Sequence, residues 1–168
     1  MKLADAFAKL ILSEGDTLDL NPKDRGNWSG GVCYVGELKG SKYGISAAAH
    51  PDIDIANLTP DAAMSIYKKE YWDPIWGDQL PDVVAFELFD EAVNMGVFGA
   101  VKVLQGAVGV AKDGRMGPGT FAALSAVDPS KLGVLMCASR LEFYTYLSNW
   151  PDESRGWARR VARDLRNL

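Results

Sequence analysis

The sequence predicts a mainly α-helical protein with one small β-hairpin in its first third. Three observations indicate this fold class. Apolar residues recur at helical spacing through most of the chain, Thr-Pro, Gly-Pro and Asp-Pro pairs mark helix starts, and two short runs of strand-forming residues lie between residues 32 and 45. With 168 residues, of which 48% are hydrophobic and 24% charged, the chain is long enough to bury a core.

The first predicted helix begins near residue 3 and ends at Glu14, with Gly15 as the residue that terminates it. Its apolar face consists of residues at i, i+4, i+7 and i+8: Leu3, Phe7, Leu10 and Ile11. Glu14 continues this face by one more step of i+4. Burial and the negative end of the helix dipole both disfavour a carboxylate there, so we expect a raised pKa that suits a general acid. The alternative is a side chain that turns to solvent at the helix end.

A polar, turn-rich segment follows Gly15, and two short strands, residues 32–36 and 42–45, are predicted around a turn at residues 39–40. This order of helix, loop and hairpin is expected to place Asp24 across a cleft from Glu14. Two carboxyl groups in different environments are the working parts of glycoside hydrolysis. The sequence therefore predicts a glycosidase site in the first 46 residues.

Three spaced motifs carry a resemblance to a known family. They are Glu14-Gly15, the run Asp24-x-Gly26-Asn27-Trp28-Ser29-Gly30-Gly31, and residues 39–46, Lys-Gly-Ser-Lys-Tyr-Gly-Ile-Ser. In this order they resemble the opening of phage endolysins of glycoside hydrolase family 108, which are N-acetylmuramidases with a helical lysozyme-like fold. The chain departs from the family pattern at Asp16, where glycine is usual, and at Ser41, where threonine is usual.

The resemblance implies hydrolysis of the β-1,4 bond between N-acetylmuramic acid and N-acetylglucosamine in bacterial peptidoglycan. Glu14 would act as the general acid, Asp24 would activate water or stabilise positive charge, and Ser41 would hold the water or Asp24. The separation of the carboxyl groups is open, and so is the choice between an inverting and a retaining reaction. Candidate substrate-binding residues are Tyr43, Trp28, Trp72 and Asn94. A core position for Trp72 and a helix-capping role for Asn94 are the structural alternatives.

Further helices are predicted over residues 59–71, 81–95, 100–107 and 121–126, followed by one after Asp128 and one that begins within residues 151–154. The block Asp-Gly-x-x-Gly-Pro-x-Thr at residues 113–120 resembles a turn of predicted peptidoglycan-binding domains. We therefore expect a catalytic lobe over residues 1–95 and a helical peptidoglycan-binding lobe over residues 96–168, packed as one body. We also expect a monomer.

The last predicted helix has an apolar side and an arginine side, the latter formed by Arg155, Arg159, Arg163 and Arg166. Such a side either meets an anionic envelope surface or is simply solvated. The net charge of −4 gives no indication of nucleic-acid binding. The chain has one histidine, His50, and two cysteines far apart in the sequence, Cys33 and Cys137. We therefore expect no metal site, no cofactor, no disulfide and no Ser/His/Asp hydrolase site.

The sequence shows no signal-peptide pattern, so the family resemblance implies a host-cytoplasmic protein that a holin or an export system releases to the cell wall. Two other functions remain open. A lytic transglycosylase would use Glu14 alone, as acid and then as base, with the substrate's own hydroxyl as nucleophile. A non-catalytic cell-wall-binding or secretion-assisting protein would keep the fold without turnover, and the departures at Asp16 and Ser41 favour it.

Overall fold

The computed structural model describes residues 1–148 and 150–166, and it describes the backbone but not the side chains of Ser13, Glu14, Pro129 and Ser130. Helices account for 59% of the chain, and the described part contains one two-stranded antiparallel sheet. The predicted mainly α fold with a small hairpin is therefore confirmed. The chain forms two compact units: an N-terminal unit, Lys2–Glu70, and a C-terminal unit, Tyr71–Leu168 together with Met1.

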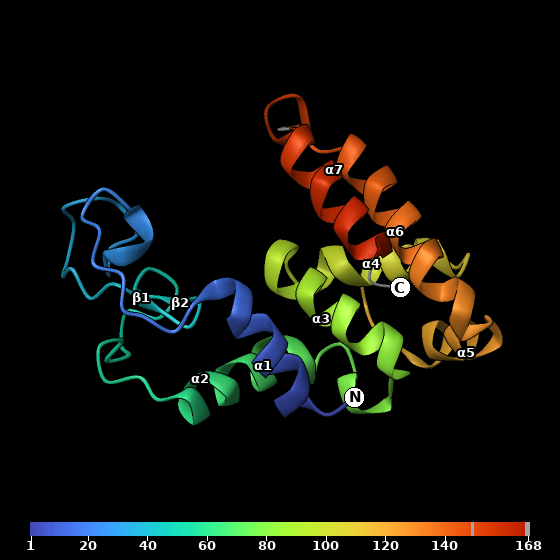
Figure 1. Ribbon diagram of the computed structural model, residues 1–168, viewed down its shortest axis with the longest axis horizontal. Helices are drawn as coiled ribbons and strands as arrows, with labels where there is room; N and C mark the ends of the chain where they lie inside the picture. The colour runs from blue at the N-terminus through green and yellow to red at the C-terminus, as the bar shows by residue number, and fades with distance from the viewer. Residues whose placement is uncertain (149, 167–168) are drawn as a thin grey trace. The chain divides into compact units, whose positions relative to one another are not determined.

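The N-terminal unit contains two neighbouring helices joined by a long segment of loops and a short hairpin (Figure 1). In chain order its elements are α1 (Leu3–Glu14), the 3₁₀ turn η1 (Arg25–Asn27), β1 (Ser41–Lys42), β2 (Ile45–Ser46) and α2 (Pro60–Tyr67). The π-helical turn η2 (Lys68–Trp72) follows α2 and spans the boundary between the two units. α1 contacts α2, and the rings of Phe7 and Tyr67 lie 5.5 Å apart. Phe7 and Leu10 of the predicted apolar face are buried, so the helical periodicity located the core of this unit correctly.

Local capping residues fix where α2 begins. The Thr59 hydroxyl accepts a hydrogen bond from the Ala62 N–H at 3.3 Å, and Pro60 occupies the first helical turn, where its missing N–H costs nothing. The predicted helix over residues 59–71 is confirmed in type. Its last turn widens into η2.

The hairpin lies later in the chain than predicted. Its strands pair Ser41 with Ser46 and Lys42 with Ile45, and the turn falls at residues 43–44 instead of 39–40. Residues 32–36, predicted as a strand, form turns, with Tyr34 at a φ of +67° and exposed by 70%. Residues with a high strand propensity form no strand here, because neither of the two described strands pairs with this segment and covers its side chains.

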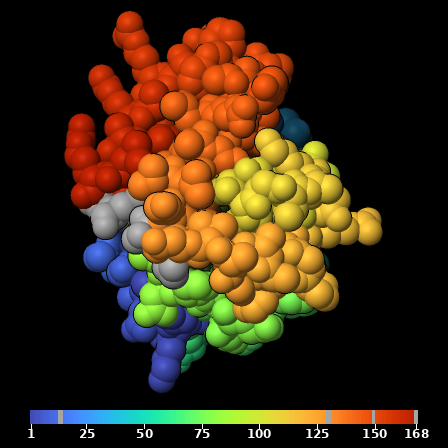
Figure 2. All heavy atoms as spheres, turned by 90° about the vertical axis from the view of Figure 1, so that its right-hand side faces the viewer, coloured from blue at the N-terminus to red at the C-terminus, as the bar shows by residue number. Residues whose placement is uncertain are grey.

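The C-terminal unit is a helical bundle built around α3. Its elements are η3 (Gly77–Gln79), α3 (Asp82–Met95), α4 (Val97–Ala107), α5 (Pro118–Ala126), α6 (Pro129–Thr145) and α7 (Trp150–Arg166). α3 packs against α4 and α6, and α6 packs against α7 (Figure 1). Figure 2 shows the face on which α5, α6 and α7 lie, with long side chains projecting from the C-terminal segment.

A buried glutamine organises the turn before α5. The Gln105 side chain donates to the Asp113 carboxylate at 2.7 Å and to the Arg115 carbonyl at 3.2 Å, and it accepts from the Gly114 N–H at 2.8 Å. Gly114 has a φ of +72°, and a Cβ at this position would lie 2.4 Å from the Phe98 ring. The predicted turn is therefore confirmed, and α5 begins at Pro118 of the Gly-Pro pair, before the predicted range of residues 121–126.

None of the described helices is long and apolar enough to cross a bilayer.

Candidate active site

Glu14 is the last residue of α1, as predicted. Gly15 ends the helix at a φ of +83°, which glycine adopts without strain, and its N–H donates to the Ile11 carbonyl at 2.9 Å. The Glu14 side chain lies outside the described part of the structure, so its orientation and its environment stay predictions. The backbone does show that Glu14 sits at the negative end of the helix dipole.

The segment from Asp16 to Ser46 is held by side chains that bind its own backbone. The Asp19 carboxylate accepts from the Asn21 N–H at 2.9 Å, the Asn21 side-chain oxygen accepts from the Lys23 N–H at 3.1 Å, and Asp24 accepts from the Gly26 N–H at 2.8 Å. Such turns replace regular structure in a polar loop. They give the loop a defined conformation without a large core.

Asp24 is exposed to solvent and caps η1 with one of its two carboxylate oxygens. Glycine at position 26 makes room for this contact, because a Cβ there would lie 3.2 Å from the Asp24 Oδ1. A solvent-exposed carboxylate of fixed direction is suited to orient a water molecule. The spacing Asp-x-Gly in the family motif thus has a steric reason in this chain.

Ser41 joins the same region through the hairpin. It exchanges two backbone hydrogen bonds with Asp19, at 2.8 and 2.9 Å, and it pairs with Ser46 in the sheet. A Cβ on Gly26 would lie 3.7 Å from the Cβ of Ser46, so the Asp24 turn packs directly against the strand that pairs with Ser41. The predicted hydrogen bond between the side chains of Ser41 and Asp24 stays a prediction.

A fully buried asparagine connects the two arms of the loop, and sequence reasoning did not single it out. Asn27 donates to the Asp19 carboxylate at 3.2 Å and to the Asn21 carbonyl at 3.1 Å. The backbone carbonyl of Asn27 accepts from the N–H groups of Lys39 and Gly40, both at 3.0 Å. Its position within the motif was the available signal, because asparagine between two glycine-containing turns is a residue that binds backbone groups.

Tyr43 lies at the hairpin turn with a φ of +54°, followed by Gly44 at +74°. Two positive φ values in succession are the geometry of a tight type I′ turn, which is uncommon for a bulky residue such as tyrosine. The Tyr67 hydroxyl donates to the Tyr43 carbonyl at 2.9 Å and ties the turn to α2. Backbone strain of this kind occurs often at binding sites, so Tyr43 stays a candidate for substrate contact.

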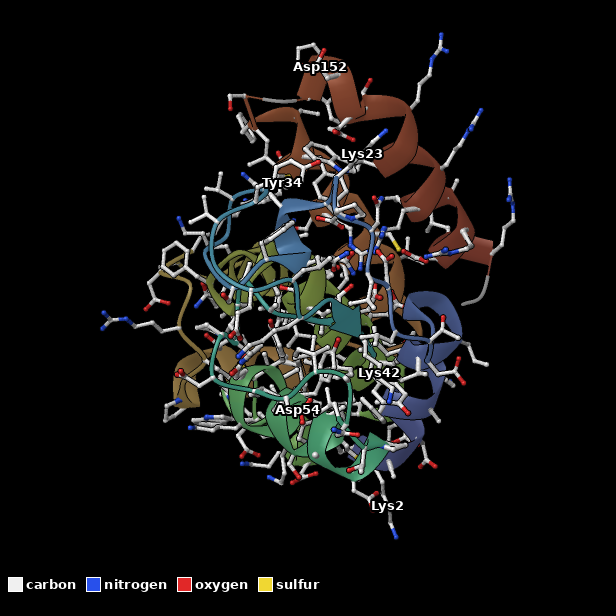
Figure 3. The ribbon with its side chains drawn as sticks, turned by 90° about the vertical axis from the view of Figure 1, so that its left-hand side faces the viewer. Lys2, Lys23, Tyr34, Lys42, Asp54 and Asp152 are labelled. Atoms are coloured by element: carbon white, nitrogen blue, oxygen red, sulfur yellow. The ribbon has the colours of Figure 1, made fainter. Side chains whose placement is uncertain are left out.

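Trp28 belongs to an aromatic pair earlier in the loop, before the hairpin. Its indole N–H donates to the Pro22 carbonyl at 3.0 Å, and its ring lies 5.2 Å from that of Tyr34. Figure 3 shows Lys23 and Tyr34 at one end of the loop segment, away from Lys42 in the hairpin. Because both rings keep part of their surface in solvent, this pair offers a face on which a sugar ring can stack.

Trp72 belongs to the core of the C-terminal unit and does not line a binding surface. It has no exposed area, its N–H donates to the Asp78 carboxylate at 2.9 Å, and its ring meets Phe89 edge-on at 5.5 Å. A ring enclosed in this way has no face left for a sugar, so the core position that was the structural alternative for Trp72 applies.

Asn94 is exposed at the end of α3. Its side-chain amide donates to the Asp90 carbonyl at 2.7 Å, and the residue lines a cavity of about 330 Å³.

The C-terminal unit also contains a buried ionic cluster, the Arg140 cluster, formed by Arg140, Glu87, Glu91 and Asp164. Arg140 binds Glu91 and Asp164 at 2.6 Å each and lies 3.6 Å from Glu87, and Arg140 and Glu91 are each exposed by only 1%. One oxygen of Glu91 and one terminal nitrogen of Arg140 have no hydrogen-bond partner in the described structure. The cluster joins α3, α6 and α7 and has an excess of acids over its one central cation.

Stability should fall as pH rises through the neutral range because of this cluster. Burial raises the pKa of Glu91 from 4.5 to about 8 and that of Glu87 from 4.5 to about 7, against the opposing attraction of Arg140. Between pH 4.5 and about 8 the folded chain binds more protons than the unfolded chain, so the free energy of unfolding decreases with increasing pH. Urea denaturation at a series of pH values measures this slope.

Glu91→Gln is the matched variant for this measurement, since it keeps the shape of the side chain and removes one titrating group. We expect a flatter dependence on pH in the variant than in the parent. A free energy of unfolding that rises over this range in the parent would contradict the assignment.

The predicted arginine side of α7 is exposed, and Val161 on the other side of the helix is buried. The arginine side consists of Arg155, Arg159, Arg163 and Arg166. Contact of this arginine side with an anionic envelope surface stays a prediction. Among the described residues, no group of three or more His, Cys, Asp or Glu side chains is arranged to hold a metal ion.

Comparison with known proteins places these features in a family. The model of the family described as Glycosyl hydrolase 108 matches residues 7–96, and that of the Predicted Peptidoglycan domain matches residues 99–162. The two matches meet close to the predicted division at residue 95, whereas the compact units divide after Glu70. The assignment of separate tasks to two lobes stays a prediction.

Among solved structures, the chain is similar to one described as the structure of Brucella abortus SagA. The two share 29% sequence identity with a TM-score of 0.73, over 96% of this chain and 90% of that chain. No curated protein matches the chain. The matches identify a glycoside hydrolase that acts on peptidoglycan and has a lysozyme-like fold. Since the first family model spans more than half of the sequence, the chain belongs to glycosyl hydrolase family 108.

Proposed function

We propose that this protein is an N-acetylmuramidase that hydrolyses the β-1,4 bond between N-acetylmuramic acid and N-acetylglucosamine, with Glu14 as general acid. The observation that carries the proposal is the arrangement after α1. Asp24, held by the Gly26 N–H, packs through that glycine against the strand paired with Ser41, in the segment that directly follows Glu14. Family membership supports the same chemistry.

In this mechanism the Glu14 carboxyl group donates its proton to the oxygen that bridges the two sugars. Positive charge then develops at the anomeric carbon. Asp24 stabilises that charge and activates the attacking water, because its exposed carboxylate has one oxygen fixed by the Gly26 N–H. The Ser41 hydroxyl holds the water molecule.

Tyr43 and the Trp28–Tyr34 pair contribute surfaces for the glycan in this proposal. The hydrogen bond from the Tyr67 hydroxyl fixes the backbone carbonyl of Tyr43 at the hairpin turn, and the bond from the Trp28 indole N–H to the Pro22 carbonyl fixes the Trp28 ring. An aromatic ring whose orientation is set before the ligand arrives loses little conformational entropy on binding. Both are therefore suitable positions for stacking against sugar rings.

Mass spectrometry of the products from purified peptidoglycan tests this function. We expect soluble disaccharide-peptides with reducing N-acetylmuramic acid ends, each of which takes one oxygen atom from the solvent when the reaction runs in oxygen-18 water. Products with 1,6-anhydro ends and no solvent oxygen would instead identify a lytic transglycosylase. Binding to the walls without any soluble product would identify the non-catalytic alternative.

A further inference from the structure

The end of α3 and the facing sides of α6 and α7 enclose a cavity of about 330 Å³ that the mechanism above does not use. Its walls include Asn94, Tyr144, Trp157 and Arg160, which all belong to the C-terminal unit. The volume is at the lower end of the range for small-molecule sites. A cavity of this size suits one ring-sized group better than an extended segment of polymer.

One wall of the cavity is an aromatic platform. The rings of Tyr144 and Trp157 lie 4.7 Å apart at an interplanar angle of 32°, and Trp150 lies 6.2 Å from Trp157. Tyr144 is 95% buried and fixes the platform, whereas Trp157 keeps part of its surface in solvent. A flat apolar surface at the mouth of a small cavity is complementary to the C–H face of a pyranose ring.

The rim of the cavity supplies polar groups from two helices. The Asn94 amide nitrogen donates to the Asp90 carbonyl, so its Oδ1 is the atom available to accept a hydrogen bond from a ligand. The Arg160 side chain is 34% exposed and lies 3.6 Å from Asp90, and its guanidinium group carries five N–H donors. An acceptor and a donor beside an aromatic platform match an acetamido group, which has one N–H and one carbonyl.

The charges behind the cavity select against a purely anionic ligand. Asp90 faces Arg160, and two acids of the Arg140 cluster, Glu87 and Glu91, lie within three residues of Asp90 on α3. The positive charge of Arg160 is therefore balanced locally. A neutral amino sugar is favoured over a phosphate or a peptide carboxylate, because burial of an unbalanced charge is costly.

We infer that this cavity binds a single N-acetylated amino sugar, with its ring on Trp157 and its acetamido group between Asn94 and Arg160. Identification of that sugar as part of a peptidoglycan strand rests on the proposed function. The cavity would hold the strand through residues of α3, α6 and α7, while Glu14, Asp24 and Ser41 belong to the N-terminal unit. The role of Asn94 as an acetamido-binding residue then belongs to this cavity.

Titration of the full chain with N,N′-diacetylchitobiose, followed by NMR of the tryptophan indole N–H signals, tests the inference. The chain carries Glu14→Gln to prevent turnover, and Trp157→Phe assigns the Trp157 signal. We expect the Trp157 signal to shift with N,N′-diacetylchitobiose and to stay unchanged with cellobiose, which lacks the acetamido groups. Equal shifts with both sugars, or no shift at saturating probe, would overturn the inference.

Asn94→Leu is the decisive variant, because the residue is exposed and the replacement keeps a side chain of similar size. We expect the affinity of the cavity for N,N′-diacetylchitobiose to fall about tenfold, the effect of one lost hydrogen bond. Asn57→Leu, at an exposed asparagine of the N-terminal unit, is the matched control and should bind like the parent. An unchanged affinity in Asn94→Leu would refute the assigned contact.

Failure of this inference is distinguishable from failure of the proposed function. Release of reducing disaccharides by the wild type, together with a silent Trp157 signal, would leave the muramidase and remove the sugar cavity. A Trp157 signal that responds to N,N′-diacetylchitobiose in a protein that releases no product would leave the cavity and remove the muramidase.

Discussion

Replacing Glu14 with glutamine should lower the initial rate of peptidoglycan hydrolysis by at least about 100-fold, the usual contribution of a positioned general acid. Glutamine has nearly the same shape as glutamate, but its amide has no proton of suitable acidity for the bridging oxygen. We expect the negative end of α1 to favour the protonated form of Glu14, which is the form that the proposed reaction consumes. The rate is measured as the release of reducing ends from purified walls.

Two controls separate this chemical effect from a loss of structure. Glu37→Gln makes the same exchange at an exposed loop position, and we expect it to retain the parental rate. The midpoint of thermal unfolding should be unchanged in both variants within the scatter typical of surface substitutions. If Glu14→Gln digested walls as fast as Glu37→Gln, Glu14 would have no part in the proton transfer.

Sequence patterns predicted those elements whose boundaries are set by neighbouring residues. Thr59 and Pro60 begin α2, Gly117 and Pro118 begin α5, and Gly15 ends α1. In each case the capping group lies within a few residues of the backbone group that it satisfies. Such interactions can be predicted from a single sequence because they do not depend on the rest of the fold.

The hairpin shows where local information ends. Residues 32–36 have the composition of a strand, yet Val32 and Tyr34 are exposed by 58% and 70% and turn instead of pairing. The short strands formed on either side of Tyr43 and Gly44, a turn that requires two positive φ values. Strand identity depends on a partner and on turn geometry, and the sequence run by itself specifies neither.

In the candidate site, too, some features could be predicted from the sequence and others only from the structure. The order of Glu14, Asp24 and Ser41 was readable as a motif. The hydrogen bond from the Ala48 N–H to the Gly26 carbonyl, at 2.9 Å, joins distant positions and came only from the structure. The buried role of Asn27 was likewise invisible, since its partners lie on both arms of the loop. Side chains that bind distant backbone groups need the folded chain to be recognised.

The Arg140 cluster is the largest feature that sequence reasoning did not assemble. Glu91 and Arg140 lie on different helices and 49 positions apart in the sequence, and Asp164 lies a further 24 positions away. Charged residues on apolar faces of three separate helices are the signal that was available. Burial of one such residue implies a partner, and the other two are the natural candidates.

Replacing Arg140 with methionine should therefore destabilise the protein by about 3–5 kcal/mol, the cost of removing one partner from a buried ionic group. Methionine fills much of the arginine volume, so the loss of stability comes from the acids of α3 and α7 left without their cation and not from a large cavity.

Arg159→Met, at an exposed position of α7, is the matched control and should change the free energy of unfolding by less than about 0.5 kcal/mol. Urea denaturation at about pH 9, above the raised pKa of both Glu87 and Glu91, measures both variants. The loss in Arg140→Met should shrink at about pH 5, because the carboxyl groups whose pKa burial raises are protonated there and no longer need a cation. A loss of the same size at both pH values would mean that Arg140 acts through packing alone.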